Sequence, residues 1–188
     1  LPPGERELAA AEQQIVRRRL TQPPNDNAYD SLRAAHRIAP LMSQLPQAGQ
    51  RWLAAATPYI TSALAEGNAE TAQSLYARGA TLADELLLRE SEAWSELEGL
   101  VVSAFATRLQ TAHAQRDLAA LHRIKDEAKQ WGVAPARLEP LWSRAVVSAK
   151  PGDVLRSGST SMVLARMPTS DRPGVAVQPN AVTRQDYA

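Results

Sequence analysis

The chain has 188 residues, of which 44% are hydrophobic and 5% are aromatic. It carries 21 basic and 20 acidic residues, and its formal net charge is +1. So small a charge produces no overall attraction to nucleic acid or acidic lipid. There is no cysteine, which excludes disulfides, thiolate metal sites and thiol catalysis within this chain. The length is enough for one core of ordinary size plus an appendage.

The longest apolar runs, near Leu53–Ala65 and Leu100–Ala106, are interrupted by polar residues or proline and are too short to cross a bilayer. The chain begins at Leu1 without a methionine, and it shows no signal peptide. We therefore interpret it as a piece of a longer protein.

The first predicted helix runs from Gly4 to Leu20 and ends in three consecutive arginines, Arg17–Arg19. The dipole of a helix favours positive charge in its last turn, so we interpret these arginines as terminal charges; a binding patch is the alternative. Paired prolines then stop the helix. Asp26 or Asn27 is expected to cap a second helix, Ala28–Ile38.

A helical hairpin over Arg51–Leu88 is predicted to organise the rest of the chain. Gly67 can take the left-handed conformation that ends a helix, and Asn68 is a good N-cap for the next one. A break this short makes the two helices antiparallel. Pro58 is expected to kink the first of them. The apolar residues recur at helical spacing on both sides of the turn: Trp52, Ala56, Tyr59, Ile60, Ala63 and Leu64 before it, and Ala69, Ala72, Leu75, Tyr76, Gly79, Ala83 and Leu86 after it.

Three more helices are predicted after the hairpin. The first spans about Arg89 to Gln115, the second is capped by Asp117 and closed by Gly132, and the third starts at Pro135. The helical period disappears near Lys150, after which two short strands are expected at 161–166 and 174–178. We accordingly place a helical domain at 4–148 and a linker with two strands at 149–188. The fold class is mainly α: an antiparallel stack of helical hairpins with a short C-terminal β appendage.

Candidates for chemistry are few. His113 and His122 flank one predicted turn, where Asp117 or Asp126 would have to complete a zinc site, but surface or half-buried histidines are the favoured interpretation. Four residues, Glu85, Arg89, Glu92 and Glu96, share a helical stripe that is typical of a solvated face with ion pairs rather than of acid–base catalysis.

Four tryptophans lie on apolar faces and are predicted to pack in the core rather than to form a ligand cage: Trp52, Trp94, Trp131 and Trp142. The Ser-Gly-Ser-Thr-Ser run at 157–161 is interpreted as a flexible linker, because no helix follows it to form a phosphate cradle. Phosphate-loop, dinucleotide-binding and nucleophile-elbow motifs do not occur. We predict no catalytic, cofactor-binding or metal-binding residue, and no enzymatic activity in this chain.

Three family resemblances add to this interpretation. Gly67, Ala72, Tyr76 and Gly79 follow the order of small and aromatic residues in half of a tetratricopeptide-type repeat, although the upstream Trp-Leu-Gly pattern of that repeat is absent. The stretch RRRLTQPPNDNAYDSLRAAHRIAP resembles a segment of extracytoplasmic regions in bacterial membrane proteins, including receptor-like Ser/Thr kinases, where it follows the membrane span.

The stretches SMVLARMP and GVAVQPNAVTRQDYA resemble the opening of formylglycine-generating-enzyme-like (sulfatase-modifying-factor) domains, which begin with an M-V-x-(V/I)-P strand. Val182, Thr183, Tyr187 and Ala188 match a later V-T-x-x-x-Y-A segment, while Ala181 replaces the usual Glu. The catalytic and metal-binding residues of that family lie downstream of this segment, so none is carried over.

The resemblances imply a non-catalytic periplasmic sensor or scaffold region of a bacterial membrane-anchored signalling protein such as a Ser/Thr kinase, with a membrane anchor N-terminal to this chain. Its partners would be proteins, a second copy included, and not nucleic acid. The alternative is the leading fragment of a formylglycine-generating-enzyme-like protein whose active half is absent. A generic peptide-binding helical adaptor would fit the helices but leave the tail unexplained.

Overall fold

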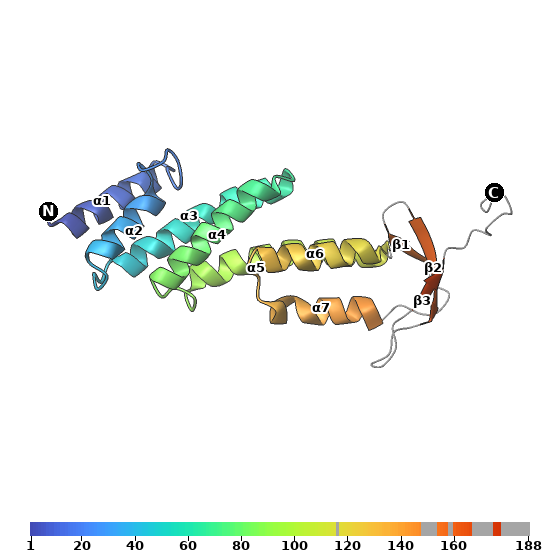
Figure 1. Cartoon of the computed structure of the whole chain (residues 1–188). Helices are drawn as coiled ribbons and strands as arrows, with labels where there is room; N and C mark the ends of the chain where they lie inside the picture. Colours follow the sequence, from blue (N-terminus) through green and yellow to red (C-terminus); the bar gives the residue numbers. More distant parts are fainter. Residues whose placement is uncertain (116, 148–153, 158–159, 167–174, 178–188) are drawn as a thin grey trace, which may run out of the picture. The chain divides into compact units, whose positions relative to one another are not determined.

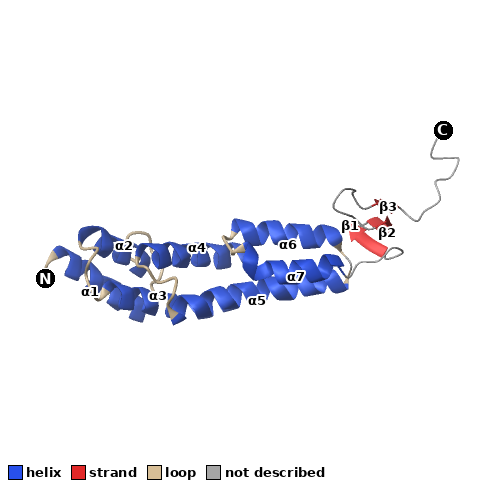
Figure 2. Ribbon diagram, turned by 90° about the horizontal axis from the view of Figure 1, so that it is seen from below, coloured by secondary structure: helices blue, strands red, loops and turns tan. Residues whose placement is uncertain are grey.

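A computed structural model describes residues 1–115, 117–147, 154–157, 160–166 and 175–177. The chain is mainly α-helical, as predicted (Figure 1). The described residues form these helices and strands: α1 (Pro3–Val16), α2 (Ala28–Ile38), α3 (Leu45–Ala65), α4 (Ala69–Glu85), α5 (Glu92–Ala114), α6 (Leu118–Gln130), α7 (Pro135–Val147), β1 (Val154–Ser157), β2 (Thr160–Arg166) and β3 (Val175–Val177) (Figure 2).

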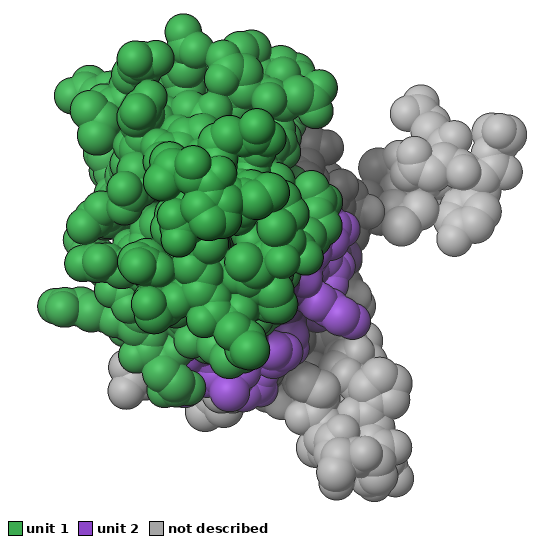
Figure 3. Space-filling model, turned by 90° about the vertical axis from the view of Figure 1, so that its left-hand side faces the viewer, with its two compact units in different colours: residues 1–101 green, residues 102–188 purple. Residues whose placement is uncertain are grey.

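The chain divides into two compact units, unit 1 (Leu1–Val101) and unit 2 (Val102–Ala188), coloured separately in Figure 3. The division falls inside α5. The domain boundary expected near residue 149 is a different division of the chain, and it stays a prediction.

Unit 1 is built from two antiparallel helix pairs, α1 with α2 and α3 with α4 (Figure 1). The start of α1 lies against the end of α2, since a Cβ added at Gly4 would come within 2.9 Å of Ala39 Cβ. Likewise, a Cβ added at Gly49 near the start of α3 would lie 2.6 Å from Leu86 Cδ1, just beyond the end of α4. Glycine therefore permits the close contact in each pair.

The core of unit 1 forms around α3 and α4, where Trp52 and Tyr76 are buried. Tyr76 stacks on Trp94 of α5 with ring centroids 5.6 Å apart. Gly79 lets α4 approach its neighbours, because an added Cβ would lie 3.0 Å from Leu97 Cδ2 and 3.2 Å from Leu53 Cδ2. The predicted inward face of α3 is wrong at Tyr59, whose side chain is 41% exposed.

Four helices end in the same hydrogen-bonded motif, in which one residue takes a left-handed backbone conformation. That residue is Gly67 after α3 and Gly132 after α6, with φ of 74° and 78°. It is Arg18 after α1 and Leu87 after α4, with φ of 60° and 56°. The next backbone N–H donates to a carbonyl five residues back in every case, at 2.7 to 3.0 Å: Arg19 to Gln14, Asn68 to Ala63, Leu88 to Ala83 and Val133 to Ala128.

Unit 2 contains the end of α5, helices α6 and α7, and an antiparallel sheet in the order β1-β2-β3. Phe105 of α5 meets Trp131 edge-on with ring centroids 5.3 Å apart. Strand β1 was not predicted. Ser157 pairs with Thr160, so the stretch interpreted as a flexible linker begins and ends in paired strands; residues 158–159 lie outside the described part.

Within the described residues, none of the helices combines the length and the apolar composition that a bilayer crossing requires.

Candidate functional site

The loop between α1 and α2 is fixed to the core of unit 1 through Leu20. The Leu20 side chain is buried, and its carbonyl oxygen accepts hydrogen bonds from the Trp52 indole Nε1 at 3.1 Å and from the Tyr29 backbone N–H at 3.0 Å. A buried tryptophan N–H normally requires such a partner. The loop backbone next to Leu20, which carries Arg18 and Thr21, is therefore held in one place.

Asn27 caps α2, as predicted, and also closes the loop. Its Oδ1 accepts from the Asp30 backbone N–H at 3.0 Å, while its Nδ2 donates to the Pro23 carbonyl at 2.8 Å and to Asp30 Oδ2 at 2.6 Å. The other predicted cap, Asp26, instead accepts from Gln14 Nε2 and from Arg19 Nη1. The loop is thus cross-linked by polar contacts at both ends.

The sequence placed Arg17–Arg19 in the last turn of a helix ending at Leu20, and this prediction is wrong. Helix α1 ends at Val16, and its last turn holds no basic residue. The helix stops early because Arg18 adopts the left-handed conformation. The arginines therefore belong to the fixed loop.

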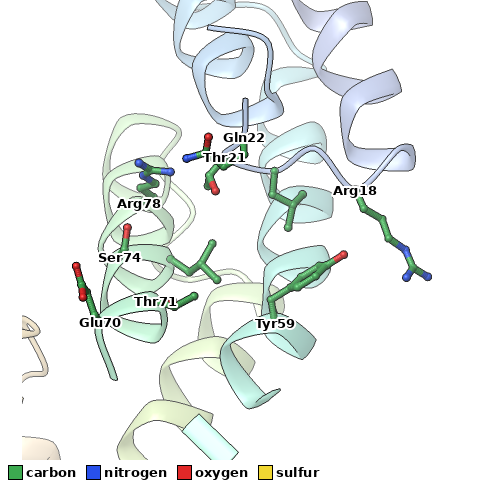
Figure 4. Close-up of a pocket in the computed structure, with 10 residues that line it drawn as sticks. Arg18, Thr21, Gln22, Tyr59, Glu70, Thr71, Ser74 and Arg78 are labelled. Carbon is green, nitrogen blue, oxygen red and sulfur yellow. The ribbon is translucent and has the colours of Figure 1, made fainter. Parts of the chain in front are cut away.

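Residues of this loop help to line three neighbouring surface depressions, with volumes of about 440, 460 and 430 Å³. The first and third share Arg18, Leu20 and Tyr59, and the second and third share Ile15 and Val16. We call the continuous surface that they form the Arg18 groove. Its first depression also takes residues from α4 (Figure 4): Glu70, Thr71, Ser74, Leu75 and Arg78.

Apolar side chains are exposed in the Arg18 groove. Val16 is 83% exposed and Tyr59 is 41% exposed. Removing apolar surface from water is favourable, roughly in proportion to the area buried. The groove therefore offers a surface whose burial would be favourable.

The charge of the groove is predominantly positive. Four arginines and two glutamates line it, and Glu12 is already paired with Arg51 at 2.8 Å. Arg17 and Arg18 make no ion pair with any described residue. Arg78 contacts the ring of Tyr29, with 5.5 Å between its Cζ and the ring centroid. Glu70 is a single negative charge and does not cancel the charges of Arg17, Arg18 and Arg78, so the net charge of the groove is positive.

The predicted stripe of Glu85, Arg89, Glu92 and Glu96 is not one helical face, because α4 ends at Glu85 and α5 begins at Glu92. Glu85 pairs instead with Arg33 of α2, whose Nε and Nη2 lie 2.7 to 3.0 Å from its oxygens. This hydrogen bonding raises the pKa of Arg33. Arg89 turns back to Asp84, and its hydrogen bonds lower the pKa of that carboxyl. The first contact joins the middle of α2 to the last residue of α4, and the second joins the loop after α4 to the last turn of that helix.

The candidate zinc ligands are not assembled. The described residues contain no group of three His, Cys, Asp or Glu side chains able to hold a metal ion. His122 packs against Trp142 with ring centroids 5.0 Å apart, and Asp117 caps α6 by accepting from the Ala120 N–H. Trp52, Trp94 and Trp131 are buried, as predicted, whereas Trp142 is half-buried beneath Lys125, whose Nζ lies 4.5 Å from the ring centroid.

Sequence reasoning did not find the groove, because its lining comes from α1, α3, α4 and a loop that are separated along the chain. The run Arg17–Arg19 was the one signal available for it. Comparison of the chain with protein-family models, with curated proteins and with solved structures gave no match.

Proposed function

We propose that this chain is a non-catalytic region of a larger signalling protein and that it acts by binding another protein at the Arg18 groove. The observation that carries the proposal is the combination, in one groove, of exposed apolar side chains and a backbone fixed by buried hydrogen bonds. A surface ordered before binding loses less conformational entropy when a partner docks.

The chemistry of the lining supports a protein partner. Tyrosine and arginine are enriched in protein–protein interfaces and supply much of their binding energy. The groove offers Tyr59, Arg18 and Arg78, together with the hydroxyl groups of Thr71 and Ser74. Its three depressions extend over two helix pairs, as an extended partner segment requires.

The cellular setting is proposed from the resemblance alone. The stretch from Arg17 to Pro40 holds the loop that builds the groove, and it resembles extracytoplasmic segments that follow a membrane span in receptor-like Ser/Thr kinases. We therefore propose a periplasmic location and a membrane anchor N-terminal to this chain. From the separate resemblance to a tetratricopeptide-type repeat we propose that its hairpins stack in the same manner. The paired helices of unit 1 are compatible with such stacking.

Site-specific photo-crosslinking in cells tests the proposal. A photoreactive phenylalanine analogue would replace Tyr59 in the groove or, as the matched control, Gln47 on the same helix. Gln47 is exposed and lies twelve residues away, about 18 Å along α3. We expect a discrete protein adduct from position 59 and none from position 47. Equal labelling at both positions, or none at position 59, would contradict the proposal.

A second candidate function is the opening of a formylglycine-generating-enzyme-like domain. One observation favours it: β2, which contains Met162 and Val163, pairs with β3, and both strands fall in the stretches that carry the resemblance. Residues 178–188, which hold the V-T-x-x-x-Y-A match, lie outside the described part. If the candidate is correct, cutting the chain near Ala149 should leave the helices folded with an almost unchanged melting temperature. Unfolding of the helices on truncation would refute it.

A further inference from the structure

We infer that the segment bound by the Arg18 groove is acidic and carries an apolar residue between its carboxylates. This inference rests on the proposed function and adds the chemistry of the partner. The groove carries net positive charge, its arginines lie on either side of the half-exposed Tyr59, and Val16 is exposed beyond Arg18.

The unpaired charges of the groove are positive. Arg17 and Arg18 are exposed and make no ion pair among the described residues, and Arg78 rests on a tyrosine ring instead of a carboxylate. Glu12 is paired with Arg51, which leaves Glu70 as the acidic group of the lining that could oppose them. A partner with carboxylates would complement this surface, and a basic partner would be repelled.

The arrangement of the arginines favours an extended segment over a single small anion. Figure 4 shows Arg78 on the α4 side of the groove beside Thr21 and Gln22, whereas Arg18 lies on the opposite side, beyond Tyr59. In Figure 4 the Arg18 side chain points out of the depression, whereas Arg78 reaches toward Gln22, so the two guanidinium groups do not converge on one point. A peptide that crosses Tyr59 can place one carboxylate near each arginine.

The region between the arginines contains an apolar patch. Tyr59 and the buried Leu75 line it beside the hydroxyl groups of Thr71 and Ser74, and Val16 extends the apolar surface beyond Arg18. An aliphatic or aromatic side chain of the partner would cover Tyr59 while its acidic neighbours reach the arginines. Such a segment resembles the recognition of acidic motifs by arginine clusters, with an apolar anchor added.

Arg18 occupies a position where glycine would be less strained. A left-handed conformation is less favourable for a non-glycine residue than for glycine, and the same motif ends α3 and α6 with Gly67 and Gly132 and α4 with Leu87. The arginine side chain is exposed and makes no described ion pair that would offset this cost. Binding of a carboxylate would supply the missing interaction.

An NMR titration of the full chain tests the inference. The probe is a short synthetic peptide in which glutamates alternate with leucine and phenylalanine. One control peptide replaces the glutamates by lysine, and the other replaces the apolar residues by serine. We expect shift changes confined to Val16–Gln22, Tyr59 and Thr71–Arg78, weaker binding at higher salt, and little or no binding of either control.

Variants make the test specific. Arg18→Gln and Arg78→Gln should each weaken binding about fivefold to tenfold, because each removes one charge-assisted contact. Arg37→Gln is the matched control, since Arg37 is exposed on α2, outside the groove, and should leave the affinity unchanged.

Equal binding of the lysine peptide, an equal loss in Arg37→Gln, or shifts outside the groove would overturn the inference. Concentration-dependent shifts of the same resonances without peptide would also overturn it, since they would identify a second copy of the chain as the occupant. Crosslinks from position 59 to a basic or uncharged segment would refute the inference that the bound segment is acidic and would leave the proposed function standing. Absence of both crosslinks and peptide binding would refute the inference and the proposed function together.

Discussion

The two helix pairs of unit 1 use the same devices to reverse the chain. Each first helix ends in a left-handed residue, Arg18 in one pair and Gly67 in the other, and each second helix is capped by an asparagine, Asn27 or Asn68. They differ in length and in polar content. Only Glu66, Gly67 and Asn68 join α3 to α4, whereas residues 17–27 form a cross-linked loop between α1 and α2.

The two connections differ in whether they contain more than a chain reversal requires. The α3–α4 turn carries what a turn requires: glycine at the strained position and an exposed cap with one hydrogen bond to the Thr71 N–H. The α1–α2 loop has a buried cap and an arginine at the strained position. We therefore interpret the α3–α4 pair as the framework and the α1–α2 loop as the part shaped for binding.

The largest expected effect tests whether the α3–α4 pair is the framework. Tyr76 is 2% exposed and stacks on Trp94, so Tyr76→Ala should destabilise the protein by about 3–5 kcal/mol. Tyr59→Ala, at the exposed tyrosine of the same pair, should cost less than about 1 kcal/mol. Chemical denaturation of both variants provides the comparison. A cost for Tyr76→Ala as small as that of Tyr59→Ala would contradict the assigned core.

The two caps give the next largest effect. Asn27→Ala removes three hydrogen bonds at a residue that is 1% exposed, and it takes one of two donors from the Pro23 carbonyl, which keeps the Asp26 backbone N–H. We expect a loss of about 2–3 kcal/mol. Asn68→Ala removes one exposed bond and should cost about 1 kcal/mol. If the two losses, measured by denaturation, prove equal, the loop is not held by its buried cap.

The strained helix ends should respond in opposite directions. Gly67→Ala should destabilise by about 1 kcal/mol through backbone strain alone, because an added Cβ meets nothing within 4 Å. Leu87→Gly should stabilise by about 0.5–1 kcal/mol, since Leu87 has φ of 56° and is 88% exposed. Melting curves of both variants test this pair of signs. Destabilisation by Leu87→Gly would mean that the Leu87 side chain makes stabilising contacts in the folded protein that the glycine variant loses.

The smallest effect concerns the ion pair that follows α4. Hydrogen bonds from Arg89 lower the pKa of Asp84 from its ordinary value of 3.8. A lowered folded pKa means that the pair stabilises the protein above that ordinary value and loses its contribution as the pH falls through the folded pKa. The Asp84 side chain is 64% exposed, so the contribution should be a few tenths of a kcal/mol. The stability difference between the protein and Asp84→Asn should shrink between about pH 5 and pH 2; a constant difference would rule out the linkage.

Local patterns in the sequence predicted most of the α3–α4 pair, although not the exposure of Tyr59. The Gly67-Asn68 turn, the buried Tyr76 and the close approach at Gly79 all follow from spacing and from turn chemistry within 40 consecutive residues. The same is true of the Asn27 cap. Helix existence and capping are decided by neighbours in the sequence, and they are therefore predictable.

The α1–α2 loop was not predictable in the same way. Nothing local indicates that Arg18 ends α1, because arginine is a good helix former and rarely takes the left-handed conformation. The contact between Leu20 and Trp52 joins residues 32 positions apart. Glu85 and Arg33 are likewise 52 positions apart, and Glu85 pairs with Arg33 instead of with its predicted neighbour Arg89. The groove depends on such contacts, which a linear pattern does not record.

The central claim is that Arg18 occupies its strained position in order to bind a partner. The most direct test is the affinity of Arg18→Gly for the glutamate-rich peptide, measured by NMR titration of a variant whose loop backbone is relieved of strain. Arg18→Gly should be at least as stable as the unmodified chain yet bind the peptide about fivefold to tenfold more weakly. Unchanged affinity in this variant would show that the Arg18 side chain takes no part in binding, and the account of the groove would be wrong.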